Sequence, residues 1–232
     1  MADPNDTYRL PTADVSVGRM IVVPAIITFA VTLIRLVGEV MGWSPRLFNR
    51  EAGGGGALIG IVWLVPIFAI YFALKLVHAG LGPRRVGATI GWSVLGIVVF
   101  VLAGALSAAL HLPPVGFISV FAVASAAVIA VAWRGWPVLA RVLFAYGLAA
   151  RVPVAAVMLV AMLAGWGTHY EKGPPDFPAM GTIATWFWIG LMPQLTLWIA
   201  FTVAVGLLFG GLAAAVALRG SGTAAVPETT RA

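Results

Sequence analysis

Residues 86–133 read VGATIGWSVLGIVVFVLAGALSAALHLPPVGFISVFAVASAAVIAVAW, a stretch without a single Asp, Glu, Lys or Arg. A helix needs about 20 apolar residues to cross the ~30 Å hydrocarbon layer of a bilayer. The stretch is therefore long enough to cross twice, and HLPPVG at residues 111–116 supplies a turn in its middle. It predicts two consecutive transmembrane helices. A second charge-free stretch, residues 177–218, extends the same pattern.

The composition of the whole chain agrees with a membrane location. Hydrophobic residues make up 61% of the chain and charged residues 9%, whereas a soluble domain is roughly half apolar and about a quarter charged. So few charges cannot cover the surface of a soluble domain of this length, so the apolar excess must face lipid. We predict an all-α membrane protein.

The apolar segments predict a bundle of about six transmembrane helices over residues 17–218, between disordered cytoplasmic tails at 1–16 and 219–232. The expected spans are 17–41, 57–80, 86–110, 115–133, 137–164 and 183–218. The last span is too long for one crossing at 1.5 Å per residue. Pro193 is expected to break it, because proline removes a helix hydrogen bond and clashes with the preceding turn.

Lys and Arg residues are distributed unequally between the two sides of this bundle. One side carries Arg9, Arg19, Lys75, Arg84, Arg85, Arg134, Arg141, Arg219 and Arg231, and the other carries Arg46, Arg50 and Lys172. Basic residues accumulate on the cytoplasmic side of membrane proteins. The bias predicts a multi-pass protein of the cell membrane with both termini inside. It also accounts for the net charge of +6, so we expect no nucleic-acid partner.

A polar stripe runs along the first span. Thr28, Thr32, Arg35 and Glu39 follow at intervals of 4, 3 and 4, which places them on one helix face. Arg35 and Glu39 can form an ion pair at i, i+4. The stripe is an internal staple, or its arginine reaches toward the headgroups, or it is part of a site that binds a ligand or ion.

Arg151 lies near the centre of the fifth span, two residues before Pro153. Ionisable residues at this depth are costly and are candidates for function. Its partner could be Glu39 from another helix, carbonyl groups freed near Pro153, water, or a bound anion.

One face of the last span combines polar and small residues. Gln194, Trp198, Thr202 and Gly206 share this face, and Gly206 and Gly210 form a GxxxG pattern. Small residues let a second helix approach closely. The second helix could belong to this chain, to a second copy or to a membrane-protein partner.

The segment WGTHYEKGPPDFP at residues 166–178 holds three prolines together with His169, Glu171 and Asp176. We predict that this loop packs over the outer mouth of the bundle. His-x-Glu spacing is not specific for a metal, and cysteine is absent, so no metal ligand set is predicted. His78 and His111 fall at opposite membrane faces and could not share a heme; no cofactor is expected.

Three segments of the C-terminal third stand out as sequences: YGLAARVP at 146–153, WGTHY at 166–170 and MPQLTLW at 192–198. In these segments the chain resembles a set of uncharacterised bacterial polytopic integral membrane proteins. The resemblance implies a bacterial inner membrane and marks Arg151, His169 and Gln194 as recurring features. It implies no activity.

Two arginines against one glutamate within the spans favour a polar cavity, open to the outer side, that binds or moves a small anionic solute or a lipid headgroup. Besides membrane lipids, this solute is the expected partner. The candidate ligand-binding residues are Arg151, Arg35, Glu39, Gln194, His169 and Glu171. The alternative is an accessory or scaffold subunit in which the same groups only lock helices together. An enzyme ranks third, since no Ser–His pair, paired acids or His-Glu-x-x-His motif supports one.

Overall fold

A computed structural model describes residues 16–54 and 57–221. The tails expected at 1–16 and 219–232 lie largely outside the described residues, and the last helix continues to Ser221. The part of the chain that is described contains helices and turns but no strand. Five helical segments are long and apolar enough to cross a membrane, and a shorter apolar helix joins them. The predicted all-α membrane bundle is confirmed.

The main helices follow the expected spans closely, with one exception. Two 3-10 turns, η2 (Ala52–Gly54) and η3 (His169–Glu171), lie in the connections. The helices are α1 (Val17–Val40), α2 (Leu64–His78), α3 (Val86–Ala109), α4 (Pro114–Gly135), α5 (Pro137–Ala164), α6 (Thr182–Thr185), η4 (Trp186–Leu191), α7 (Met192–Leu195) and α8 (Leu197–Ser221).

The second span is the exception. A helix was expected over residues 57–80, but α2 begins only at Leu64, and residues 57–63 are irregular, with bends at 58–61 and a turn at 62–63. The backbone N–H groups of Leu58 and Ile59 donate to the carbonyls of Arg46 and Leu47 instead of to a helix of their own. Its 15 residues give α2 a length of about 22 Å, less than the ~30 Å hydrocarbon layer.

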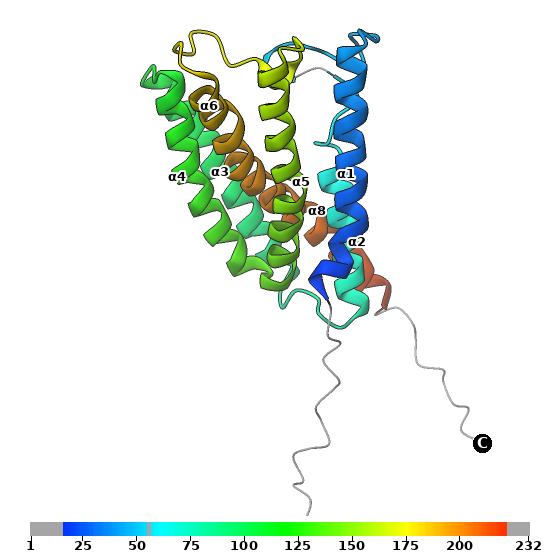
Figure 1. Ribbon diagram of the computed structural model, residues 1–232. Coiled ribbons are helices and arrows are strands. Elements are labelled where there is room, and N and C mark those ends of the chain that lie inside the picture. Colours follow the sequence, from blue (N-terminus) through cyan, green and yellow to red (C-terminus); the bar gives the residue numbers. More distant parts are fainter. Residues whose placement is uncertain (1–15, 55–56, 222–232) are drawn as a thin grey trace, which may run out of the picture.

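The last span departs from α-helical geometry on both sides of Pro193, as the sequence predicted. Residues 186–191 form a π-helix, which ends just before the proline. Thr196 then leaves the helical region with φ −108° and ψ −81°. The segment nevertheless follows one oblique helical path across the bundle (Figure 1).

Helix α8 is central to the packing and contacts α2, α3, α4 and α5, while α1 packs mainly on α5. The start of α1 and the end of α8 lie at the same end of the bundle (Figure 1). We call this the tail end, and the opposite end, which carries residues 41–54 and 165–181, the loop end.

The GxxxG face of α8 packs within the chain. A Cβ on Gly206 would lie 2.6 Å from Leu143 Cδ2, and one on Gly210 would lie 2.6 Å from Leu139 Cδ2. Both leucines belong to α5. The two glycines therefore allow α5 and α8 to approach, and this face is not free for a second copy or another protein.

The outward surface of the bundle is apolar. Large side chains on several helices point outward, among them Ile26 (63% exposed), Val101 (64%) and Val216 (73%). Buried polar side chains lie on the inner faces instead. This distribution is the one expected for a bundle whose solvent is lipid.

Candidate functional site

The polar stripe of α1 faces the interior of the bundle. Thr28 and Thr32 are buried, and Glu39 has no exposed surface. The Thr28 hydroxyl hydrogen bonds with the Tyr146 hydroxyl of α5 at 2.8 Å. The hydroxyl of Tyr170, in the loop after α5, donates to the carbonyl of Thr32 at 3.3 Å. The predicted helical spacing is thus confirmed, and the stripe faces α5 and the loop that follows it.

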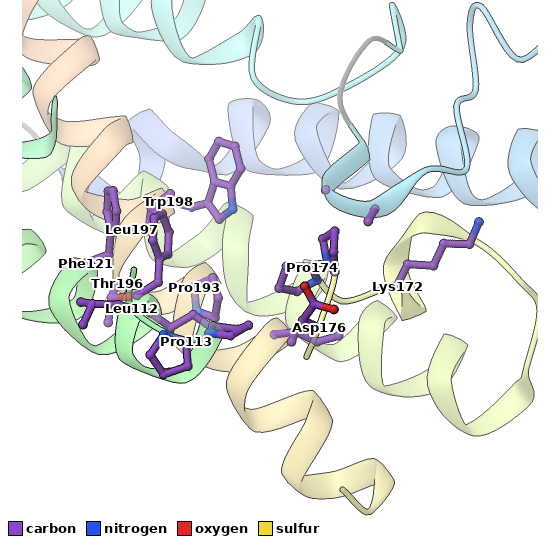
Figure 2. Close-up of a pocket in the computed structure, with 17 residues that line it drawn as sticks. Leu112, Pro113, Phe121, Lys172, Pro174, Asp176, Pro193, Thr196, Leu197 and Trp198 are labelled. Carbon is purple, nitrogen blue, oxygen red and sulfur yellow. The ribbon is translucent and has the colours of Figure 1, made fainter. Parts of the chain in front are cut away.

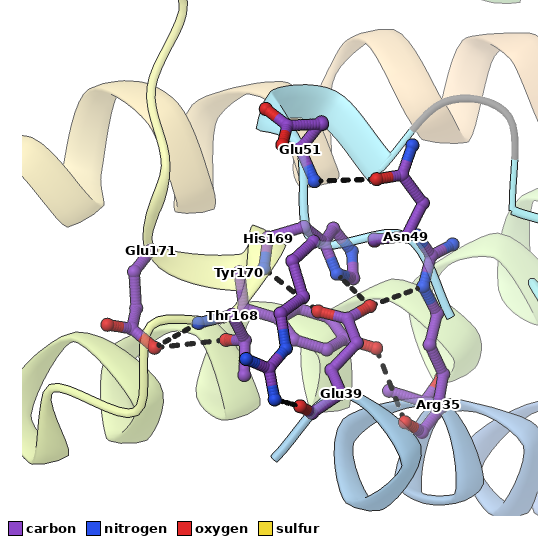
Figure 3. A network of polar contacts seen from close by, with 10 residues as sticks. Arg35, Glu39, Asn49, Glu51, Thr168, His169, Tyr170 and Glu171 are labelled. Carbon is purple, nitrogen blue, oxygen red and sulfur yellow. Dashed lines mark hydrogen bonds and ion pairs between the residues drawn. The ribbon is translucent and has the colours of Figure 1, made fainter. Parts of the chain in front are cut away.

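At the loop end, Glu39 is the centre of a polar cluster with Arg35 and His169 (Figure 3). Arg35 Nε donates to Glu39 Oε1 at 2.9 Å, which confirms the predicted i, i+4 pair. The backbone N–H of His169 donates to Glu39 Oε2 at 2.9 Å, and His169 Nδ1 lies 2.5 Å from Oε1. Arg50 donates to the backbone carbonyl of Glu39. Both carboxylate oxygens are therefore used by the protein itself.

Burial determines how the loop groups titrate. It lowers the pKa of His169 below its ordinary value, although the hydrogen bond to Glu39 acts in the opposite direction. Burial also raises the pKa of Tyr170. At neutral pH we therefore expect a neutral imidazole and a protonated phenol, so neither group compensates the positive charge of the nearby arginines.

The first part of the loop after α5, residues 168–171, packs against the bundle, whereas most of residues 172–178 are exposed. Thr168 is fully buried and Tyr170 is 4% exposed. Glu171 closes a local turn: its carboxylate accepts from the Thr168 backbone N–H and hydroxyl, both at 3.0 Å, and from the Gly167 N–H. Glu171 thus serves this turn and does not face the interior of the bundle.

Arg151, at the middle of α5, is the most deeply buried cation described. Arg151 is only 4% exposed. Its Nη1 donates to Gln194 Oε1 at 3.5 Å, and its guanidinium lies 4.6 Å from the ring centroid of Trp198. Among the described residues no carboxylate pairs with it, because Glu39 pairs with Arg35 and His169. The sequence suggested Glu39 or a carbonyl near Pro153 as the partner of Arg151. In the structure its side chain contacts Gln194 and Trp198 instead.

A cavity of about 360 Å³ lies between the cluster around Glu39 and the buried Arg151. Three cations contribute to its wall, and none of the described residues that line it is acidic. Five of the polar and aromatic residues in that wall are Gln194, His169, Tyr170, Thr32 and Trp198. The three cations are Arg35, Arg151 and Lys172. The cavity therefore combines positive charge with hydrogen-bond donors.

The irregular segment before α2 forms one wall of this cavity. Ala57 and residues 60–63 line it, and Gly60 lies so close to Arg35 that an added Cβ would be 3.2 Å from Nη1. Non-helical backbone at membrane depth is tolerated where it is buried in protein or lines a water-filled cavity. This segment meets that condition by lining the cavity.

Four of the six residues predicted from the sequence line the same cavity: Arg35, Arg151, His169 and Gln194. Glu39 lies behind the wall and orients Arg35 and His169, and Glu171 stays in its turn. The sequence reading did not single out Lys172 or Trp198 as site residues, although Trp198 follows Gln194 at helical spacing. His169, Glu171 and Asp176 do not converge: no group of three potential metal ligands occurs among the described residues.

The fold and the buried polar cavity define the class of this molecule: it is a polytopic integral membrane protein. Neither a family model, nor a curated protein, nor a solved structure matches the chain.

Proposed function

We propose that the bundle binds an oxyanion, a small anionic solute or the headgroup of an anionic lipid, in the cavity beside Arg151. The observation that carries this proposal is the buried guanidinium without a carboxylate partner, facing a cavity lined by two further cations. A buried charge that lacks a counter-ion costs several kcal/mol. An anion in the cavity would supply the missing charge and accept from the planar N–H fork of arginine.

The geometry of the cavity suits such a ligand. Gln194 and Trp198 hold one side of the guanidinium, by a hydrogen bond and by the ring face. Gln194 also donates to Met158 Sδ at 3.7 Å, which orients its oxygen toward Arg151. Arg151 is thus held in place before a ligand arrives, and preorganisation of this kind reduces the entropy lost on binding.

We further propose that the loop end faces the outside of the cell. Among the described residues, the helix ends and the α2–α3 connection at the tail end include Arg19, Lys75, Arg84, Arg85, Arg134, Arg141 and Arg219, and the segments at the loop end include Arg46, Arg50 and Lys172. This bias supports a cell-membrane protein with both termini inside. The anion would then reach the cavity from the outer side.

The accessory or scaffold function is supported by a different observation. The Glu39 carboxylate is hydrogen bonded to Arg35 and to His169, and the bonds to His169 tie α1 to the loop after α5. This cluster holds the loop after α5 against α1. Arg151 distinguishes the two functions, because a scaffold would need it dry and bound only to Trp198 and Gln194.

The test is anion binding to the purified protein in lipid nanodiscs. Inorganic phosphate and glycerol 3-phosphate serve as probes, and glycerol serves as the uncharged comparison. We expect both phosphates, but not glycerol, to bind and raise the unfolding temperature, because a ligand that binds only the folded state stabilises it. Arg151→Met should weaken phosphate binding at least tenfold.

Arg46→Met is the matched control. It removes the same charge from an exposed position at the loop end and should bind as the unaltered protein does. Arg151→Lys keeps the charge without the fork and should bind with intermediate affinity. Unchanged phosphate affinity in a folded Arg151→Met protein, or no phosphate binding by the unaltered protein, would reject anion binding in favour of the scaffold function.

A further inference from the structure

A second, larger cavity of about 830 Å³ adjoins the cationic one. Its side chains come from the turn between α3 and α4, from α4, from the junction of α7 and α8, and from the loop at residues 172–176 (Figure 2). The apolar part of its wall includes Leu112, Phe117, Ile118, Phe121 and Leu197.

The two cavities share a wall. Gly53, Lys172, Ile189 and Trp198 line both of them. Trp198 stands between the apolar space and Arg151, with its ring against the guanidinium. A ligand that passes this residue would touch cations on one side and hydrocarbon on the other.

The charges of the second cavity are confined to one segment. Lys172 and Asp176, from the loop after α5, are its charged lining residues. Lys172 belongs to the shared wall, so the positive charge lies toward Arg151. The side formed by α4 is apolar and includes Phe117, Ile118 and Phe121. The apolar cavity is therefore suited to an alkyl chain.

We propose that the two adjoining cavities together bind one anionic amphiphile, with its phosphate group at Arg151 and its alkyl chain in the apolar cavity beside Phe121. This rests on the proposed anion site and names the class of its ligand. A lipid ligand is favoured over a free solute because the cationic cavity shares one wall with a space of about 830 Å³, which a small oxyanion cannot fill. Most of the side chains that line this second cavity offer no hydrogen-bond partner.

The experiment uses the full-length protein in phosphatidylcholine nanodiscs. The probe is a lysophosphatidic acid whose alkyl chain carries a photoreactive diazirine, and the labelled residues are identified by mass spectrometry. We expect labels on residues 112–121 and 193–198. Arg151→Met should reduce this labelling at least tenfold, and a monoacylglycerol with the same diazirine chain should label the region at least tenfold less.

Ile118→Trp places a larger side chain in the apolar cavity, whereas Val123→Trp makes the same change at a residue of α4 that is 75% exposed. Ile118→Trp should reduce lysophosphatidic acid labelling about tenfold and leave glycerol 3-phosphate binding unchanged, and Val123→Trp should alter neither. If Ile118→Trp labels like the unaltered protein, or if labels fall only on outward residues, the amphiphile proposal is overturned while anion binding stands. If Arg151→Met also binds glycerol 3-phosphate normally, the anion site itself is rejected.

Discussion

His169 contacts the Glu39 carboxylate through both its backbone and its ring, across 130 positions of sequence. The backbone bond measures 2.9 Å, and the ring Nδ1 lies 2.5 Å from the other oxygen. Glu39 of α1 therefore holds the loop after α5 in place at the loop end of the bundle. The bonds also orient Arg35, whose guanidinium lines the cationic cavity.

Glu39→Gln should destabilise the bundle by about 3 kcal/mol, because removing one member of a buried ion pair leaves the other charge without compensation. Reversible unfolding in mixed micelles measures the change. Glu51→Gln, at an exposed position, is the control and should lie within about 0.5 kcal/mol of the unaltered protein. Equal stability of the two variants would contradict a structural role for the Glu39 cluster.

The stability of the protein should fall at acidic pH through His169. Burial lowers the pKa of the folded imidazole, so below the ordinary value of about 6.5 the unfolded chain binds more protons than the folded one. Stability from this group is therefore complete above that pH and decreases as the pH falls toward the lower folded value. The groups facing His169 are Glu39 and Arg35 from α1 and Lys172 and Tyr170 from its own loop.

Unfolding measured between pH 5 and 7.5 tests this pH dependence. His169→Gln removes the imidazole while keeping a polar side chain and the backbone bond to Glu39, and its stability should change less over the same range. The other acidic residues titrate in both proteins, so the comparison reports His169 together with the Glu39 carboxylate that it contacts. Parallel curves for the two proteins would show that His169 does not contribute.

Gly206→Ala should cost about 1–3 kcal/mol, the usual cost of overpacking, since the added Cβ would lie 2.6 Å from Leu143 Cδ2. Gly91→Ala is the matched control: it also lies inside a helix, but no atom would lie within 4 Å of its Cβ. That change should be neutral or stabilising by up to about 1 kcal/mol. A stable Gly206→Ala protein would mean that α5 and α8 can separate without loss.

Reporter fusions test the orientation. A fusion after Gly82 and one at the C-terminus should report the cytoplasm, and a fusion near Lys172 should report the outer side. The unequal distribution of Lys and Arg is the physical reason. An outer C-terminus would reverse the proposed access route to the cavity.

Helical periodicity predicted much of the fold and part of the site. The intervals between Thr28, Thr32, Arg35 and Glu39 identified the inward face of α1, and the interval from Gln194 to Gly206 identified the face of α8 that meets α5. Sequence spacing could not pair Glu39 with His169, because their contact depends on how the loop after α5 folds back. It also could not reveal the apolar cavity, whose walls come from segments that are separate along the chain.

The residue at which α2 begins also could not be predicted from the sequence. The residues from Ala57 to Trp63 are as hydrophobic as those of the helix that follows, and hydropathy does not distinguish a helix from apolar turns. Contacts outside the segment determine its conformation: the backbone bonds to Arg46 and Leu47 and the close approach of Gly60 to Arg35.

The shortness of α2 has a consequence for the surrounding bilayer. A hydrophobic element shorter than the hydrocarbon layer is accommodated by local thinning, at a fraction of a kcal/mol per Å of mismatch. Trp63, 63% exposed at the start of this helix, is the kind of side chain that anchors at the headgroup level. We expect lipid phosphates beside α2 to be drawn inward toward Trp63. Trp63 also lines the cationic cavity. The local thinning of the bilayer would therefore bring anionic headgroups next to that cavity.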